Sequence, residues 1–385
     1  MIVDSFGSGL FGPFGLLYAH VVVGLPLPRA GAALAVVGAA ALTLGPVAGA
    51  MVDRFTAAQV ATAGNLLAAV GGGVLLIARD LPLFVLGSFL GAAALRVFWA
   101  AFAPLVGDAV EPGARERWFG LLRGSRFAGM AVGGLLASVV LLLGQHRGLL
   151  VMVAVDATSY LIAGLLIALA RIAARPREVA ANPSYRVALR DRSNVALTLL
   201  NVAATLVITA PMLAMPVYVL SSLRQPAWVP GALAGTGTTA LAVGVTLVHR
   251  LTADRRRLMV LAAASVVWAL GALSYAAAGA GHGTLIMLFA AVLAFGLGEA
   301  LYGPTADTLP LAIAPAGLAG RYTAMHQVAW GISGIIAPAL VGALIGNRPT
   351  LFWLVLAGIA AGTAAAYRLL PKATQERARK VGSVT

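Results

Sequence analysis

Residues 57–78 read AAQVATAGNLLAAVGGGVLLIA, an apolar run without a charged side chain that Arg79 and Asp80 close. A helix crosses the hydrocarbon core of a bilayer in about 20 residues, so this run is long enough to do so. Twelve stretches of this kind follow one another along the 385 residues, and most of the charge lies in the short pieces between them. The sequence therefore predicts a polytopic membrane protein.

Every predicted span should be a helix. Hydrophobic residues make up 60% of the chain and charged residues only 10%, a balance that a water-soluble domain could not cover with polar surface. Open strands facing lipid would leave peptide groups unpaired, and the Ala, Leu, Val and Gly runs do not alternate as barrel strands do. The fold class is therefore all-α, with spans at 5–27, 30–52, 57–78, 82–104, 119–143, 148–170, 195–220, 229–249, 257–279, 284–306, 322–345 and 350–370.

Basic residues predict the orientation, because Lys and Arg of short loops are retained on the cytoplasmic side. With the N-terminus inside, 21 of the 27 Lys and Arg residues fall in inner segments, five fall in outer loops and Arg96 lies within a span. Both termini should therefore be cytoplasmic, in an inner or plasma membrane. The net charge of +14 is spread over separate loops, which argues against nucleic-acid binding and for contact with anionic membrane lipids.

The second half of the chain repeats the first. Pro104-Leu-Val-Gly-Asp108 is followed by Arg117-Trp-Phe-Gly, and about 200 residues later Pro304-Thr-Ala-Asp307 is followed by Arg321-Tyr-Thr-Ala. Six helices in each half give the two halves the same orientation, so the repeat is parallel. We expect an N-terminal six-helix bundle at 1–170, a polar cytoplasmic linker at 171–193, a C-terminal bundle at 194–370 and a cytoplasmic tail at 371–385.

A glycine-rich segment follows the second span and reads Gly45-Pro-Val-Ala-Gly49-Ala-Met-Val-Asp53-Arg54-Phe55. A weakened copy follows the eighth span as Gly244 to Arg250 and then Asp254-Arg-Arg-Arg257, without an acid at the position of Asp53. Within a six-plus-six repeat over nearly the whole chain, this segment resembles the Gly-x-x-x-Asp-Arg signature of the major facilitator superfamily, although the usual Gly-Arg/Lys continuation is absent. The resemblance implies two pseudo-symmetric bundles, with spans one, four, seven and ten lining a central cavity.

We interpret Asp53 as part of a gate at the cytoplasmic mouth. It would pair with Arg54 or a neighbouring Arg, or accept hydrogen bonds from a helix N-terminus in the other half. The alternative is a solvated loop acid. The residues assigned to this gate are Gly49, Asp53, Arg54, Asp108, Arg117, Asp307 and Arg321.

Ionisable groups inside the spans are few, and each is a candidate for function. Arg96 in span four and Glu299 in span ten lie at the same depth on corresponding helices. We predict that both face the cavity and that Glu299 accepts the proton; a static ion pair is an equal alternative. Asp4 is a weaker coupling candidate near the start of span one. Asp156 is a further candidate, but we favour a structural role for it, with Thr158, Ser159 and Tyr160 as polar packing partners.

Aromatic side chains occur on the spans expected to line the cavity, where they would suit a bulky amphipathic ligand. Helix packing is an equally ordinary use of such residues. Together with Arg96, the candidates for the substrate cavity are Phe11, Phe14, Tyr18, Trp99, Phe102 and Tyr302.

The sequence contains no phosphate-binding loop, no nucleophile elbow and no His pair at metal-binding spacing, so we predict no enzyme, cofactor or metal site. Within the superfamily the chain resembles drug and metabolite exporters, and this resemblance implies export. We predict a monomeric secondary transporter that exports a small, partly apolar drug or metabolite in exchange for protons, with Na⁺ as the alternative ion. An importer or facilitator of a polar nutrient is the second reading, and a receptor or scaffold is the third. Gly129-Met-Ala-Val-Gly133-Gly134 allows close helix packing but lacks the proline that drug/proton antiporters carry in span five.

Overall fold

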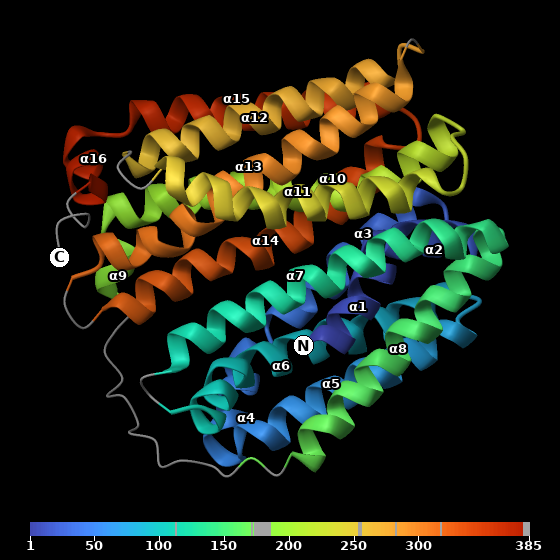
Figure 1. The fold of residues 1–385 in the computed structure, drawn as a ribbon, viewed down its shortest axis with the longest axis horizontal. Helices are drawn as coiled ribbons and strands as arrows, with labels where there is room; N and C mark the ends of the chain where they lie inside the picture. The colour runs from blue at the N-terminus through green and yellow to red at the C-terminus, as the bar shows by residue number, and fades with distance from the viewer. Residues whose placement is uncertain are drawn as a thin grey trace. The chain divides into compact units, whose positions relative to one another are not determined.

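The computed structural model describes residues 1–111, 114–170, 172, 186–252, 256–281, 283–315 and 318–379. All regular elements within these ranges are helices, and none of the described residues forms a strand (Figure 1). Nine of the described helices are long and apolar enough to cross a membrane, or ten if the bent pair α3 (Leu27–Leu42) and α4 (Gly45–Arg54) counts as one span. The predicted all-helical membrane protein is confirmed.

All twelve apolar stretches of the sequence fall on helices. The nine candidate spans are α5 (Ala57–Ile77), α6 (Leu81–Ala109), α7 (Arg115–Val140) with η3 (Leu141–Leu143), α8 (Gln145–Leu169), α10 (Arg192–Val217) with the π-helical η4 (Tyr218–Ser222), α12 (Arg257–Ala278), α13 (Thr284–Ile313), α14 (Ala319–Leu344) and α15 (Pro349–Leu369). The apolar part of α11 (Val229–Thr252) is shorter and covers Val229–Val245.

Proline and glycine break the first two stretches, which the sequence analysis treats as single helices. The first divides into α1 (Ile2–Phe11), η1 (Gly12–Phe14) and α2 (Gly15–Val21), because Pro13 has no N–H to donate to the preceding turn. The second bends by 41° between α3 and α4, where Pro46 opens the new helix. The helical part of the first stretch, which ends with α2, stops at Val21 rather than at 27, because the chain turns at Gly24, whose φ is +77°.

Two other helices run past their predicted ends. Spans four and ten are predicted to end at 104 and 306, whereas α6 and α13 continue to Ala109 and Ile313, with Pro104 and Pro304 inside them. Membrane helices tolerate internal proline because neighbouring groups satisfy the freed carbonyls. Asp108 and Asp307 therefore sit on helices and not beyond their ends.

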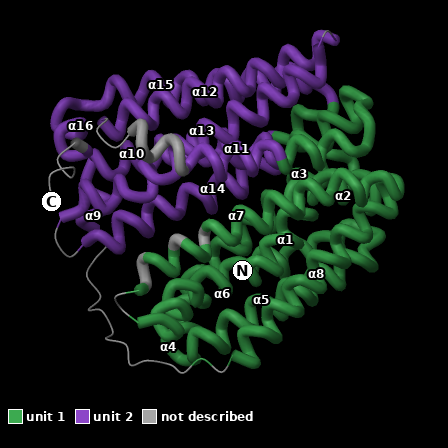
Figure 2. Tube along the Cα trace, viewed as in Figure 1, with its two compact units in different colours: residues 1–179, 213–235, 341–346 green, residues 180–212, 236–340, 347–385 purple. Residues whose placement is uncertain are grey.

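The chain divides into two compact units (Figure 2). Unit 1 comprises residues 1–179, 213–235 and 341–346, and unit 2 comprises 180–212, 236–340 and 347–385. Unit 1 thus takes residues 213–217 at the end of α10 with η4, the start of α11 and the end of α14. The division into sequence halves at 1–170 and 194–370 stays a prediction.

In unit 1, α1 packs against α7 and α8, and α5 packs against α6 and α8. Glycine makes the α1–α7 contact possible: a Cβ at Gly133 would lie 2.1 Å from the carbonyl oxygen of Phe6, and one at Gly9 would lie 2.3 Å from that of Met130. A Cβ at Gly129 would also approach the backbone of α1, at 2.9 Å from the Ile2 oxygen. The close helix approach predicted from Gly129 and Gly133 is confirmed.

In unit 2, α12 packs between α13 and α15 around a core that includes Trp268, Tyr302 and Tyr367. The short helices α9 (Arg186–Arg190) and α16 (Lys372–Arg379) lie within the predicted linker, 171–193, and the predicted tail, 371–385. The rest of the linker, 173–185, and the end of the tail, 380–385, lie outside the described residues.

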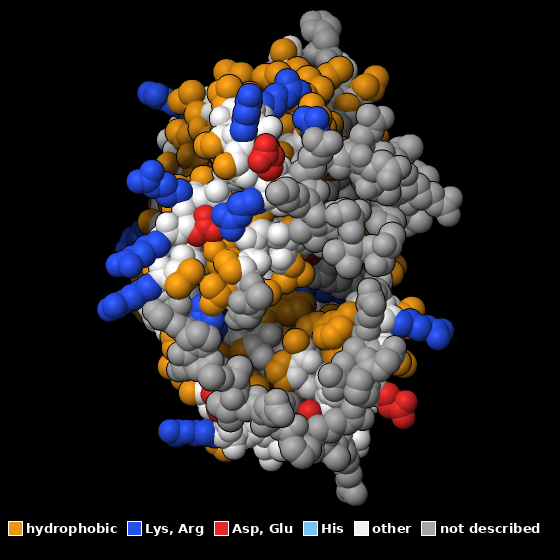
Figure 3. Space-filling model, turned by 90° about the vertical axis from the view of Figure 1, so that its left-hand side faces the viewer, with side chains coloured by type: hydrophobic (Ala, Val, Ile, Leu, Met, Phe, Trp, Pro, Cys, Tyr) orange, Lys and Arg blue, Asp and Glu red, His pale blue; other side chains and the backbone are white. Residues whose placement is uncertain are grey.

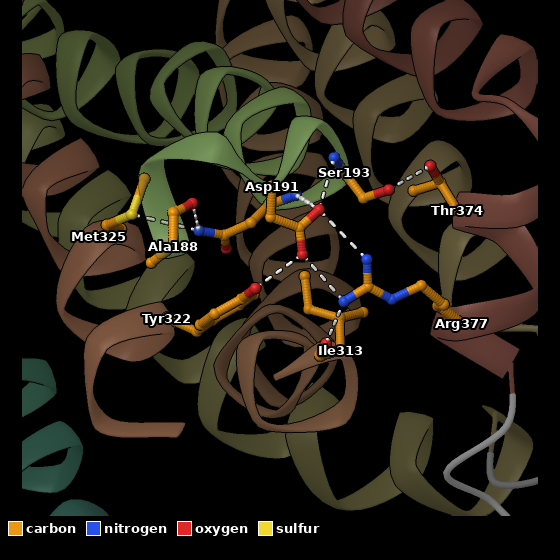
Figure 4. Close-up of polar contacts among 9 residues, drawn as sticks. Ala188, Asp191, Ser193, Ile313, Tyr322, Met325, Thr374 and Arg377 are labelled. Atoms are coloured by element: carbon orange, nitrogen blue, oxygen red, sulfur yellow. Dashed lines mark hydrogen bonds and ion pairs between the residues drawn. The ribbon is translucent and has the colours of Figure 1, made fainter. Parts of the chain in front are cut away.

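An ion pair between Arg377 and Asp191 joins α16 to the start of α10 in unit 2 (Figure 4). The guanidinium of Arg377 donates to both carboxylate oxygens of Asp191, at 3.2 and 2.9 Å, and Tyr322 of α14 donates to the same carboxylate at 2.7 Å. Asp191 also caps α10, because its Oδ1 accepts from the Ser193 N–H at 3.0 Å. Burial alone would raise the Asp191 pKa, but the hydrogen bonds from Arg377 and Tyr322 outweigh it and hold that pKa below its usual value.

Candidate functional site

A small pocket of about 50 Å³ lies within unit 2, between α10, α13 and α14. One water needs roughly 10–15 Å³ of such space, so a few waters or one small polar group would fill it. Glu299 lines it together with polar and aromatic neighbours from the three helices: Asn201, Tyr302, Thr323, His326, Gln327 and Trp330. The predicted acid of span ten therefore borders open space.

Helical periodicity brings these side chains to one place. Glu299, Tyr302 and Ala306 follow one another at i, i+3 and i+7 on α13, so they share a face. On α14, Thr323, His326 and Trp330 have the same spacing. The sequence alone shows each of these faces but not that they oppose each other.

A hydrogen-bond network ties the three helices together beside the pocket. The Tyr302 hydroxyl donates to Oδ1 of Asn201, and Nδ2 of Asn201 donates to the carbonyl of His326 at 2.9 Å. One turn along α10, Thr205 is within 2.6 Å of Ser333 Oγ. Satisfied polar networks in a low-dielectric interior rigidify their surroundings, so this wall of the pocket is preorganised.

Other polar groups at the pocket have no partner among the described residues. Only 5% of His326 is exposed, yet neither of its ring nitrogens has a hydrogen-bond partner. The hydroxyl of Thr323 is also buried without a partner, and no hydrogen bond or ion pair joins Glu299 to another described side chain. An unsatisfied buried polar group costs about 1–3 kcal/mol. The pocket therefore offers unpartnered side-chain groups to which a polar group, a proton or water can bind.

His326 and Asn201 are pocket residues that the sequence does not identify as candidates. The sequence predicts no metal role for His326, because no second His lies at metal-binding spacing. Asn201 was not singled out, although an amide in the middle of an apolar span is a polar group that needs a partner. That signal, read together with Thr205 one turn away, would have identified the polar face of α10.

The two other coupling candidates lie together in unit 1. Asp4 on α1 is buried and forms an ion pair with the Met1 amino group at 2.9 Å. Asp156 on α8 lies where α1 passes closely: a Cβ at Gly7 would be 2.8 Å from Asp156 Oδ1. Asp4 and Asp156 are near enough to interact electrostatically. Two acids from distant parts of the sequence thus lie on the same pair of packed helices, α1 and α8.

None of the expected packing partners of Asp156 forms a hydrogen bond with its carboxyl group among the described contacts. Thr158 donates to the Ala154 carbonyl and Ser159 to the Asp156 carbonyl, while Tyr160 shares a hydrogen bond of 2.9 Å with Ser8 of α1. Oδ1 of Asp156 is buried and has no hydrogen-bond partner among the described residues. The predicted structural role therefore does not rest on the partners we expected, and the role itself stays a prediction.

Arg96 is half-buried on α6, and no described residue forms a hydrogen bond or ion pair with its side chain. Arg96 belongs to unit 1 and Glu299 to unit 2, so their predicted interaction stays a prediction. One turn from Arg96, Trp99 packs edge-on against Phe102 at 5.1 Å between ring centroids, and the Arg126 guanidinium lies 4.6 Å from the Trp99 centroid. Trp99 thus makes a cation–π contact that the sequence did not indicate.

The aromatic residues of the first span mostly serve packing. Phe14 and Tyr18 have no exposed surface, and the Tyr18 hydroxyl donates to the Leu75 carbonyl of α5. Phe11 is partly exposed and packs edge-on against Tyr18 at 5.7 Å. Phe14 and Tyr18 do not line open space, which agrees with the helix-packing alternative. Tyr302 is buried as well but borders the pocket.

The proposed gate residues are dispersed over several helices. Gly49, Asp53 and Arg54 lie on α4 rather than in a loop, and all three are exposed. Neither Asp53 nor Arg54 forms a hydrogen bond or ion pair with a described residue, so the local Asp53–Arg54 pair is not formed. Asp108 is buried and Arg117 is exposed. Asp307 lines the pocket, Arg321 is half-buried on α14, and Asp254 of the second copy lies outside the described residues.

Known transporters share this fold. A POT peptide transporter superposes with a TM-score of 0.80 at 14% identity, covering 98% of this chain and 93% of that chain. The nucleoside transporter NupG gives 0.77 at 12% identity over 95% of this chain and 96% of its own. A bacterial homologue of the iron transporter ferroportin, in its inward-facing state, gives 0.76 at 14% identity over 95% of each chain. At these identities the likeness shows the fold alone.

Sequence comparison identifies the family. The multidrug resistance protein MdtH of Salmonella typhimurium is 27% identical over 326 residues, which cover 81% of this chain and 78% of that protein. The family model described as Major Facilitator Superfamily matches residues 1–338, most of the chain. The chain belongs to the Major Facilitator Superfamily.

Proposed function

We propose that this membrane transporter exports a small, partly apolar molecule in exchange for protons, by alternating access of two six-helix bundles. The observation that supports this proposal most directly is the position of Glu299. Its carboxyl group borders a small pocket inside a membrane-spanning bundle and has no hydrogen-bond or ion-pair partner among the described residues. An intramembrane acid beside such a pocket can bind a proton in one state of the transport cycle and release it in another. The name of the relative MdtH supports a drug as cargo.

Twelve spans are proposed for the complete architecture. The nine long apolar helices account for nine of them. The bent pair α3 and α4, the broken series α1, η1 and α2, and the shorter α11 account for the other three. This count keeps both termini on one side of the membrane, and the distribution of basic residues supports the cytoplasm of an inner or plasma membrane as that side.

A polar cargo is the second candidate, and one observation favours it. The pocket offers more hydrogen-bonding side chains than the sequence analysis expected, because Asn201, Thr323 and His326 join Glu299 there. The fold relatives include proteins named as nucleoside and peptide transporters. An importer or facilitator of a polar nutrient would use these groups to bind its substrate directly.

Transport in liposomes tests the proposal. Purified protein is reconstituted with an internal pH dye, and lipophilic cations, antibiotics, nucleosides and sugars are added under an imposed proton gradient. We expect proton flux evoked by an apolar or cationic compound and at least a tenfold loss of that flux in Glu299→Gln. Glu111→Gln makes the same chemical change at an exposed residue and serves as the control.

The other outcomes separate the alternatives. Counterflow of a nucleoside or sugar without proton movement would replace export with facilitation. Binding of a compound without any counterflow would indicate a receptor. Flux that survives Glu299→Gln but fails in Asp4→Asn would move the coupling site to unit 1.

A further inference from the structure

A second pocket, of about 230 Å³, lies in unit 2 where α12 begins, α15 ends and α16 packs beside them. Three arginines line it, Arg256 and Arg257 from the start of α12 and Arg368 from the end of α15. Tyr367 and Gln375 add polar groups. Figure 3 shows Lys and Arg side chains projecting from the side of the molecule on which α16 lies in Figure 1.

None of the described residues that line this pocket is acidic, so none of them cancels its positive charge. Nη1 of Arg257 is buried and has no hydrogen-bond partner among the described residues. Arg377 on α16 differs, because Asp191 neutralises it. A buried guanidinium nitrogen without a partner, beside two further cations, favours an anionic ligand that accepts several hydrogen bonds.

The start of α12 adds to the positive potential of the pocket. The first turn of α12 contains no acid, and the N-cap residue Arg256 makes no side-chain capping bond. The free N–H groups and the dipole at a helix N-terminus favour negative charge. The helix end alone would not define a site. Here the unpartnered Arg257 side chain also favours a negatively charged ligand.

The pocket also has an apolar edge. Met259 on α12 lines it and is 60% exposed, and Leu369, next to Arg368, is 82% exposed. Both helices are candidate membrane spans, so these side chains lie at the end of a lipid-facing surface. Arginines combined with an apolar edge match a phosphate group that carries hydrocarbon chains better than a free anion.

We propose that this pocket binds the phosphate headgroup of an anionic phospholipid, with Arg257 and Arg368 as its main contacts. Basic residues predict that this end of the chain faces the cytoplasm, where juxtamembrane basic groups meet anionic headgroups. The ligand bridges α12, α15 and α16 and thereby stabilises the packing of α16. This site does not depend on the cargo or on the coupling ion.

Native mass spectrometry of the full chain in detergent tests the proposal. Phosphatidylglycerol and phosphatidylcholine with identical acyl chains are titrated against the wild type, Arg257→Gln, Arg368→Gln and the control Arg348→Gln. Arg348 precedes α15 at its opposite end and is exposed. One Arg near an anionic lipid surface contributes about 1 kcal/mol, so each pocket variant should bind phosphatidylglycerol about fivefold more weakly. The control should bind it as the wild type does, and phosphatidylcholine should show no difference between variants.

A competition arm identifies the source of the phosphate. Inorganic phosphate at millimolar concentration should neither displace phosphatidylglycerol nor raise the unfolding temperature of the wild type. Displacement that is lost in Arg257→Gln would overturn the lipid as ligand and identify a site for free phosphate-type anions. Equal phosphatidylglycerol binding by all four proteins would overturn the site itself. Arg368→Gln alters an exposed side chain, so it remains informative if Arg257→Gln fails to fold.

Discussion

Acidic side chains occur on apolar helices of both units, but their surroundings differ. Asp156 in unit 1 lies at a contact where the backbone of α1 passes α8 so closely that Gly7 has no room for a side chain. Glu299 in unit 2 borders a pocket whose walls are held by hydrogen bonds between three helices. An acid pressed into a helix contact has little room for a ligand, whereas an acid beside a pocket does. The location of an acidic side chain on an apolar helix therefore does not by itself identify the functional acid.

Glycine substitution should produce the largest effect and tests how tightly unit 1 is packed. In Gly133→Ala the new methyl would meet the Phe6 carbonyl oxygen at 2.1 Å, so the backbones of α1 and α7 must separate. Overpacking costs about 1–3 kcal/mol, and a backbone clash lies at the upper end. We expect a marked drop in the unfolding temperature. Gly73→Ala on α5 is the matched control, because nothing lies within 4 Å of its Cβ position and Ala favours a helix by about 1 kcal/mol.

Neutralising the two acids separately tests the comparison itself. Glu299→Gln should lower substrate-evoked proton flux in liposomes at least tenfold while the protein remains folded. Asp156→Asn should change that flux less than twofold, because its carboxyl group lies in a packed contact. If Asp156→Asn abolishes flux and Glu299→Gln does not, the functional acid lies in unit 1.

Removing one tyrosine hydroxyl from each unit tests whether the pocket wall is more rigid than the α1–α8 contact. Tyr302→Phe leaves Oδ1 of Asn201 without its donor in a buried network, which should cost about 1–3 kcal/mol of unfolding free energy. Tyr160→Phe removes a single hydrogen bond to the partly exposed Ser8 and should cost about 1 kcal/mol or less. Thermal unfolding in one detergent measures both. Equal losses would show that the pocket wall is no more rigid than the α1–α8 contact.

The pH dependence of the Asp191–Arg377 pair should be the smallest effect. The pKa of Asp191 in the folded protein is lowered from its ordinary value of about 3.9, so the stabilisation is present above that value and is lost as pH falls through the lower folded-state pKa. Asp191→Asn keeps the capping role on α10 but removes the charge. The unfolding temperatures of the wild type and Asp191→Asn should differ by a constant amount above about pH 5 and converge below about pH 4.

A partly exposed ion pair contributes about 1 kcal/mol or less, because water screens it. Glu376→Gln, next to Arg377 but exposed, is the control and should follow the wild type at every pH. A difference between the wild type and Asp191→Asn that does not change between pH 3 and 7 would show that the charge of Asp191 does not stabilise the fold.

Much of the molecule could be predicted from local sequence. The apolar runs identified the helical segments, because lipid leaves the backbone few other ways to satisfy its hydrogen bonds. Glu299 stood out because charge is rare in such runs. Breaks at Pro13 and between α3 and α4 were not anticipated, although both contain proline, because proline only sometimes ends a membrane helix.

The sequence by itself determined an all-helical membrane protein of the Major Facilitator Superfamily, through hydrophobic runs, glycine spacing and the segment ending in Asp53-Arg54. Only the tertiary structure decided which polar residues meet. His326 reaches the Glu299 pocket from α14, Asp4 lies near Asp156, and Arg257 comes beside Arg368. The physical reason is that a side chain's helix face follows from a period of 3.6 residues, whereas the facing helix is selected by packing between segments far apart in the chain.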